Sequence, residues 1–164
     1  MRVAKRRRRE NKTNYSKRLK MLKGEKPRAI VRQTNKYFIV QYVTSDAAKD
    51  KIEIGITSKK LLTHGWPKEF AGSLKSIPAA YLTGYLFGKL VKKEKKETPI
   101  VDFGMARTLH KTKLFAFIKG AIDAGLEIPC KKEAFPEDER IQGKSLKKDF
   151  SKQFSEIKSN LEKI

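Results

Sequence analysis

The sequence predicts an α/β fold with element order βββαβα, in which a mixed sheet packs against helices. Three short runs between residues 28 and 57 predict strands, and the third, KIEIGIT, alternates apolar and polar side chains as a half-buried strand does. Two later runs, 77–93 and 113–124, place apolar residues at helical spacing, and the short apolar segment PIVDFG lies between them. We therefore expect a mixed sheet with its helices, preceded by a basic N-terminal arm and followed by a C-terminal amphipathic helix.

The charge is concentrated at the N-terminus, and this divides the chain into parts. Lysine and arginine number 39 against 18 aspartate and glutamate residues, and 13 of the 39 fall within the first 28 residues. The first 14 residues have too few apolar groups for their charge, so we expect them to be disordered in the free protein. From Tyr15, YSKRLKMLKG predicts a short helix that ends at Gly24. The predicted parts are an arm with a short helix over 1–25, a mixed α/β domain over 26–130 and a C-terminal extension over 131–164.

The strand region is typical of an antiparallel meander. Strands are predicted over 28–33, 37–43 and 51–57. The first two are joined by a turn at Thr34-Asn35-Lys36, where asparagine tolerates a left-handed backbone. TSDAAKD forms a polar turn before the third strand.

The segments after the meander have recognisable ends. SKKLLTHGW predicts a short helix that stops at Gly65, and PKEFAGSLKS predicts a surface loop. Ser76 caps a long helix that reaches about Lys93. Within this helix, Gly84 and Gly88 have the spacing that allows close packing against another helix in the core.

The next two elements complete the domain. PIVDFG predicts a buried, central strand. Thr112 is expected to cap the following helix, which ends at Gly125. The apolar residues at helical spacing in this helix are Leu114, Phe115, Ile118, Ala121 and Ile122.

A final helix is predicted to open at Ser145. Its apolar stripe consists of Leu146, Phe150, Phe154, Ile157, Leu161 and Ile164. The stripe either folds back on the core or meets a neighbouring protein, and the sequence does not choose between these alternatives.

A net charge of +21 calls for a polyanionic partner. Nucleic acid is the leading candidate, ahead of an anionic membrane surface and an acidic protein. Arginine and lysine neutralise phosphates, and the guanidinium plane also suits RNA grooves and splayed bases. Asn14 and Tyr15 can hydrogen-bond to or stack on an unpaired base.

The candidate RNA-binding residues fall into three sets: the arm, a strand patch and a loop. In the strand patch Arg28 and Arg32 share parity with Ile30 and are expected on one sheet face beside the arm, and an ordinary solvated hairpin is the alternative. The loop MARTLHKTK predicts a phosphate site, because its cations adjoin the free N–H groups of a helix start. Trp66 either stacks on a base or is an aromatic residue at the edge of the core. The full set is Arg6, Arg7, Arg8, Arg9, Lys12, Asn14, Tyr15, Lys17, Arg18, Lys20, Lys23, Lys26, Arg28, Arg32, Asn35, Lys36, Trp66, Arg107, Lys111 and Lys113.

The sequence gives no support for catalysis, a metal site or a cofactor. Cys130 is the single cysteine, and neither His64 nor His110 stands in a cluster of metal ligands. The DFG at Asp102 lacks the other motifs of a kinase, and we expect this aspartate to cap a strand end or to hold a nearby arginine. The longest nearly apolar run is too short to span a membrane.

Three blocks of the sequence resemble the family of large-subunit ribosomal protein eighteen, in its archaeal form. They are TNYSKRLKMLKGEKPRAIVRQTNKY, AAYLTGYLFGK and FAFIKGAIDAGLEIP followed by FPEDERIQG. The resemblance covers most of residues 13–146, and the predicted final helix extends past it.

The resemblance implies a structural role and not an enzymatic one. Members of this family bind 5S rRNA and help dock it on the large-subunit, 23S-type rRNA in the central protuberance, beside large-subunit protein number five. It implies a cytoplasmic location on the ribosome, no membrane contact and no homo-oligomer. The residues that it implies for 5S rRNA are Asn14, Tyr15, Lys17, Arg18, Lys26, Arg28, Arg32, Asn35 and Lys36.

Two other functions stay open at this point. An RNA-processing enzyme with a basic arm would need clustered ionisable groups in a cleft. A non-ribosomal nucleic-acid-binding protein, such as a chromatin-like DNA binder, would prefer duplex DNA to 5S rRNA.

Overall fold

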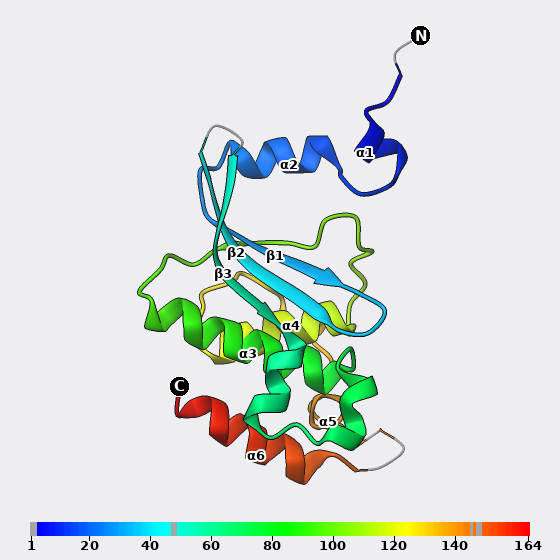
Figure 1. Ribbon diagram of the computed structural model, residues 1–164, viewed down its shortest axis with the longest axis vertical. Helices are drawn as coiled ribbons and strands as arrows, with labels where there is room; N and C mark the ends of the chain where they lie inside the picture. The colour runs from blue at the N-terminus through cyan, green and yellow to red at the C-terminus, as the bar shows by residue number, and fades with distance from the viewer. Residues whose placement is uncertain (1–2, 47–48, 145, 147–148) are drawn as a thin grey trace.

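A four-stranded mixed sheet lies at the centre of the computed structural model, which describes residues 3–46, 49–144, 146 and 149–164 (Figure 1). Strands β1 (Arg28–Gln33), β2 (Phe38–Asp46) and β3 (Lys49–Thr57) form the predicted antiparallel meander. Strand β4 (Ile100–Asp102) pairs parallel to β1, and the sheet order is β3-β2-β1-β4. The predicted α/β class is confirmed. The prediction of a central PIVDFG strand is wrong, because β2 occupies the other side of β1 and leaves β4 at the edge.

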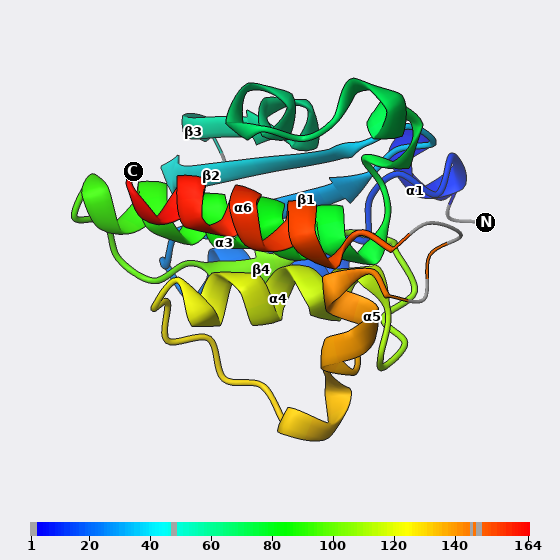
Figure 2. The same ribbon diagram turned by 90° about the horizontal axis from the view of Figure 1, so that it is seen from below.

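One face of the sheet is covered by helices α3 (Ile77–Lys93) and α4 (Lys113–Asp123), as Figure 2 shows. Alternate strand residues such as Ala29, Val31 and Val40 are fully buried in a core shared with these helices. The residues of opposite parity, such as Ile30 and Arg32, point to the other face and are half-buried. The alternation of side-chain direction along each strand therefore separates a core face from an accessible face.

Helices α3 and α4 cross at very short range. A Cβ on Gly84 would collide with the carbonyl of Phe117, and a Cβ on Gly120 would collide with the carbonyl of Tyr81. The prediction that the glycines of α3 serve close helix packing is confirmed. The cap of α3 is also as predicted, since Ser76 Oγ accepts from the Ala79 amide at 3.4 Å.

The start of α4 departs from the prediction. Thr112 occupies the N-cap position but does not cap the helix, because its hydroxyl donates to the Leu109 carbonyl at 2.7 Å. The buried face of α4 is also broader than the predicted stripe. Ala116 and Phe117 are fully buried as well, since α4 packs against α3 on one side and the core on the other.

The short connections show where local propensity was overridden. The β1–β2 turn is stabilised by Thr34 and not by a left-handed Asn35. The Thr34 hydroxyl accepts from the amides of Lys36 and Tyr37, and Asn35 does not have a positive φ. Both strands of the second hairpin extend into the predicted polar turn, with Asp46 paired to Lys49, while 47–48 lie outside the described residues.

Two 3₁₀ helices follow β3. Helix η1 (Ser58–His64) ends as predicted at Gly65, which has a φ of 103°. Helix η2 (Lys68–Ser73) occupies the segment that was predicted to be a loop.

The C-terminal extension closes over the helical side of the molecule (Figure 2). It contains η3 (Lys132–Ala134), α5 (Asp138–Gln142) and α6 (Ser151–Glu162). Phe154, Ile157 and Leu161 of α6 are buried in the common core, so the alternative in which the stripe folds back is confirmed. The predicted start at Ser145 lies outside the described residues, but the prediction of helix over Leu146 and Phe150 is wrong, because α6 begins at Ser151 and Phe150 is its N-cap.

The N-terminal arm buries no residue in either of its helices, α1 (Arg6–Arg9) and α2 (Tyr15–Leu22). The short helix predicted from Tyr15 is confirmed, whereas the expectation of disorder before it is wrong for α1. One helical turn forms there because the amides of Arg8 and Arg9 donate to the Lys5 carbonyl, and arginine favours helix. Within the described residues, no helix is long and apolar enough to cross a membrane.

Candidate nucleic-acid interface

The arm presents a dense set of cations to solvent. Arg6–Arg9, Lys12, Lys17, Lys20 and Lys23 are all exposed. Asn14 and Tyr15 are half-buried and already have contacts within the protein: Asn14 Oδ1 accepts from the Lys17 amide at 3.2 Å, and Lys5 Nζ lies 4.8 Å from the Tyr15 ring centroid. These contacts fix the start of α2 and leave the arm cations pointing outward.

A small pocket of about 90 Å³ forms where the arm meets the sheet. Five cationic side chains and one carboxylate line it, together with polar groups of the arm. The charged lining residues are Arg7, Lys12, Lys17, Arg18, Arg32 and Asp102. The pocket therefore brings together predicted residues from the arm and from β1, and its charge favours an anion.

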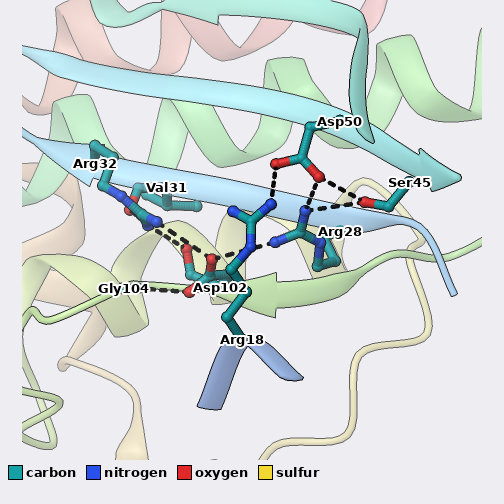
Figure 3. Close-up of polar contacts among 8 residues, drawn as sticks. All are labelled: Arg18, Arg28, Val31, Arg32, Ser45, Asp50, Asp102 and Gly104. Atoms are coloured by element: carbon teal, nitrogen blue, oxygen red, sulfur yellow. Dashed lines mark hydrogen bonds and ion pairs between the residues drawn. The ribbon is translucent and has the colours of Figure 1, made fainter. Parts of the chain in front are cut away.

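A chain of alternating charges includes three of the charged lining residues, Arg18, Asp102 and Arg32 (Figure 3). Arg18 Nη2 of α2 donates to Asp50 Oδ2 at 2.8 Å, and Arg28 Nη2 of β1 donates to Asp50 Oδ1 at 2.7 Å. The Ser45 hydroxyl donates to the same Asp50 oxygen at 2.8 Å. Side chains from the three consecutive elements α2, β1 and β2 thus meet at one carboxylate of β3.

The same chain continues to the edge strand. Arg28 Nη1 lies 3.9 Å from Asp102 Oδ2, and Arg32 Nη2 donates to this oxygen at 3.2 Å. Arg32 Nη1 also donates to the main-chain carbonyls of Val31 and Asp102, at 2.9 and 2.7 Å. The guanidinium of Arg32 is therefore held from several directions although its side chain is 40% exposed.

Asp102 has the role that its sequence context suggested. Besides holding Arg32, its Oδ1 accepts from the Gly104 amide at 2.6 Å and so caps the strand end. Gly104 has a φ of 63°, and a Cβ there would lie 2.8 Å from Arg32 Cζ. The DFG segment is thus an arginine-holding turn, and both its aspartate and its glycine are needed for that purpose.

The electrostatics of Asp50 reflect its arginine partners. Burial alone would raise the pKa of Asp50. The hydrogen bonds from Ser45 and Arg18 and the positive charges of Arg28 and Arg18 outweigh burial and set the pKa below its ordinary value of 3.8. Asp50 is therefore ionised at neutral pH and remains a permanent counter-charge for both arginines.

A second group of cations lies at the start of α4. Arg107, Lys111 and Lys113 line an open pocket of about 410 Å³, and the structure adds Arg140 of α5 to them. Burial and the charge of nearby Lys75 lower the pKa of Lys113. Lys111 is partly engaged, since its Nζ donates to Glu137 at 3.3 Å.

Comparison with known proteins identifies the family. The model of the family described as "Ribosomal large subunit proteins 60S L5, and 50S L18" matches residues 1–99. The chain belongs to this family. A curated relative named large ribosomal subunit protein uL18, from Methanoregula boonei, is 37% identical over 162 residues, which cover 99% of this chain and 90% of the relative.

Two further relatives with the same name agree. The one from Korarchaeum cryptofilum is 43% identical over 141 residues, 86% of this chain and 70% of the relative. The one from Methanosphaera stadtmanae is 44% identical over 140 residues, 85% of this chain and 70% of the relative. The chain is therefore a structural constituent of the large ribosomal subunit and not an enzyme.

For this member of the L18 family, two predicted RNA contacts need correction. Arg28 is only 1% exposed, and its ion pairs lie inside the protein, so it supports the surface instead of forming it. Trp66 is 3% exposed; its Nε1 donates to the Phe70 carbonyl and its ring packs on Phe150, so it is a core residue. The alternative of a core-edge aromatic residue holds for Trp66.

The remaining predicted residues lie on the surface of this family member. Lys26, Asn35, Lys36 and Arg107 are exposed. Sequence reasoning missed Asp50, Thr13 and Arg140. Asp50 and Arg140 reach the cationic sites only through long-range contacts, whereas Thr13 lines the arm pocket beside Arg7, which donates to its hydroxyl. No group of three or more His, Cys, Asp and Glu side chains suited to a metal ion occurs in the part of the chain that the structure describes.

Proposed function

We propose that this chain binds 5S rRNA and helps to attach it to the large-subunit rRNA in the central protuberance, beside large-subunit protein number five. The observation that carries the proposal is the cationic pocket between the arm and the sheet, because five positive side chains converge there around one carboxylate. The sequence blocks shared with the protein eighteen family point to 5S rRNA in particular.

The binding energy comes mainly from phosphate contacts. Arm side chains such as Arg8, Arg9 and Lys17 have no ion-pair partner among the described residues, so they are available to phosphates. If the protein neutralises 6–10 phosphates, its affinity falls by about 10³ to 10⁵ between 50 and 200 mM salt, taking the duplex DNA slope as a guide.

The sheet fixes the position of the RNA relative to the body of the protein. Arg32 is fixed to β1 and β4 by three hydrogen bonds, so a phosphate that it contacts has a defined place relative to the body. The pocket at the start of α4, with Arg107, Lys111, Lys113 and Arg140, offers a second contact, which suits the larger rRNA. Two separate cationic sites allow one protein to bridge two RNA surfaces.

A competition experiment tests the proposal. The affinity of the full chain for 5S rRNA is measured at fixed salt against duplex DNA with the same number of phosphates and against an unrelated structured RNA. We expect 5S rRNA to bind at least about tenfold more tightly than either competitor. Equal affinity for all three would show a non-specific cation surface and would contradict the assignment.

A further inference from the structure

The pocket between the arm and the sheet has an internal support that the net positive charge does not explain. Arg18 and Arg32 lie on its walls, and both are held by carboxylates. Arg28 lies between these carboxylates and is fully enclosed. The order of charges from α2 to β1 is Arg18, Asp50, Arg28, Asp102 and Arg32.

We propose that the pocket takes one phosphate group of the bound RNA, and that Asp50 and Arg28 are positioning residues that hold Arg18 and Arg32 toward it. The inference rests on the proposed function for the identity of the RNA. It does not depend on base sequence, because a phosphate is common to every nucleic acid.

The burial of Arg28 is the first argument. Burying a guanidinium costs free energy that its ion pairs do not reliably offset. Arg28 Nε, moreover, has no hydrogen-bond partner among the described residues. A whole buried ion-pair network can often be replaced by apolar residues without loss of stability, so stability alone does not explain why Arg28 and its carboxylate partners are here. What Arg28 provides is a fixed positive centre between Asp50 and Asp102, which orients both carboxylates toward the outer arginines.

The position of Asp50 is the second argument. A carboxylate on an RNA-binding surface repels phosphates, yet Asp50 lies beside the arm and is 27% exposed. Its two oxygens accept from Arg18 and Arg28, so its charge is used within the protein. The Arg18–Asp50 bond is also a direct tie between α2, which has no buried residue, and the sheet.

The geometry of Arg32, on the other wall of the pocket from Arg18, is the third argument. Three acceptors hold its guanidinium, and the left-handed Gly104 leaves room for it. A planar guanidinium fixed in this way presents its remaining N–H groups in one direction, and this geometry favours a tetrahedral oxyanion. Asn14, Lys17 and Arg18, at the start of α2, line the same pocket.

The test compares two aspartates of the same hairpin. Asp50→Asn and Asp46→Asn each remove one negative charge, and Asp46 has no ion-pair partner among the described residues. Charge alone predicts that both variants bind 5S rRNA more tightly. We expect Asp46→Asn to bind up to about threefold more tightly and Asp50→Asn about tenfold more weakly, the latter because charged hydrogen bonds are removed.

A double-mutant cycle separates positioning from a general effect on the fold. If Asp50 acts through Arg18, Asp50→Asn in an Arg18→Gln background changes affinity by less than about threefold. Amide hydrogen exchange of α2 in the free protein supplies a readout without RNA: it should be faster in Asp50→Asn and unchanged in Asp46→Asn. Tighter binding by Asp50→Asn, or effects of Asp50→Asn and Arg18→Gln that multiply, would overturn the proposal.

Two controls keep the result decisive. Should Asp50→Asn fail to fold, Ser45→Ala replaces it as the test. This variant changes no charge and removes the hydroxyl that donates to Asp50, so we expect about twofold weaker binding of 5S rRNA. Unchanged affinity would overturn the proposal. Should the unaltered chain not prefer 5S rRNA, the proposed function fails, and the same variants measured on duplex DNA still test the phosphate pocket.

Discussion

The two ends of this chain flank the same body but are held to it by different forces. Helices α1 and α2 of the arm bury no residue, and a hydrogen-bonded ion pair from Arg18 to Asp50 ties α2 to the sheet. Helix α6 at the other end buries Phe154, Ile157 and Leu161 in the common core. Both segments are short and highly charged, so charge content alone does not show which of them belongs to the folded body.

The difference lies in the apolar periodicity. Apolar burial contributes free energy whether or not a partner is present, whereas exposed cations gain most of theirs when a polyanion arrives. The C-terminal extension is therefore a structural part of the fold, and we propose that the arm is a binding segment. We propose that the division into arm, body and extension is one of function as well as of sequence.

The largest expected effect is a loss of stability when the apolar stripe of α6 is shortened. Ile157→Ala should lower the free energy of unfolding by about 2–5 kcal/mol, because Ile157 is fully buried between α6 and the core. Chemical denaturation measures it. Glu156→Ala, at an exposed neighbouring position, is the matched control and should stay within about 0.5 kcal/mol. An equal loss of stability in both variants would mean that α6 is not held by its apolar stripe.

A smaller effect is expected at the turn that holds Arg32. Gly104→Ala should cost about 1–2 kcal/mol, because the residue has a positive φ and the new Cβ would press on the Arg32 guanidinium. Gly72→Ala is the matched control, since its Cβ would meet nothing within 4 Å. Thermal unfolding of both variants gives the comparison. A neutral Gly104→Ala would show that the turn has no need of glycine.

The smallest effect concerns the titration of Asp50. Its folded-state pKa lies below the ordinary 3.8, so the ionised form stabilises the fold above that value, and this contribution is lost as pH falls through the lower folded-state pKa. A carbon-13 titration of the Asp50 carboxyl should give a midpoint below 3.8. Arg18→Gln should raise the midpoint, whereas an unchanged midpoint would rule out the ion pair in solution.

Much of the fold could be predicted because its signals are local. Short runs separated by turn residues, with clean alternation in the third, located three strands, and Ser76, Gly65 and the glycines of α3 marked ends and contacts correctly. The edge position of β4 could not be predicted, since strand order depends on where the chain returns after α3. Parity correctly placed Arg28 and Arg32 on one face, but the burial of Arg28 depends on Asp50, which lies 22 positions away.

In the candidate site, too, the local features could be predicted and the long-range contacts could not. Cation-rich segments were visible in the sequence, and the structure gathers several of them around the pocket. Of the two carboxylates that organise them, Asp102 was expected to hold an arginine, whereas Asp50 was not recognised, because it lies in what looked like a polar turn. Trp66 had two open roles in the sequence, and only its contact with Phe150 decides between them.

Removal of residues 1–13 tests most directly whether the arm acts through charge and not through folding. This truncation ends before the Asn14 cap, so α2 and Arg18 stay intact. We expect an unfolding free energy within about 0.5 kcal/mol of the full chain. The slope of log affinity for 5S rRNA against log salt should become shallower by about 0.7–0.9 for each phosphate that the shortened chain no longer neutralises. An unchanged salt slope, or a truncated protein that unfolds, would contradict the account.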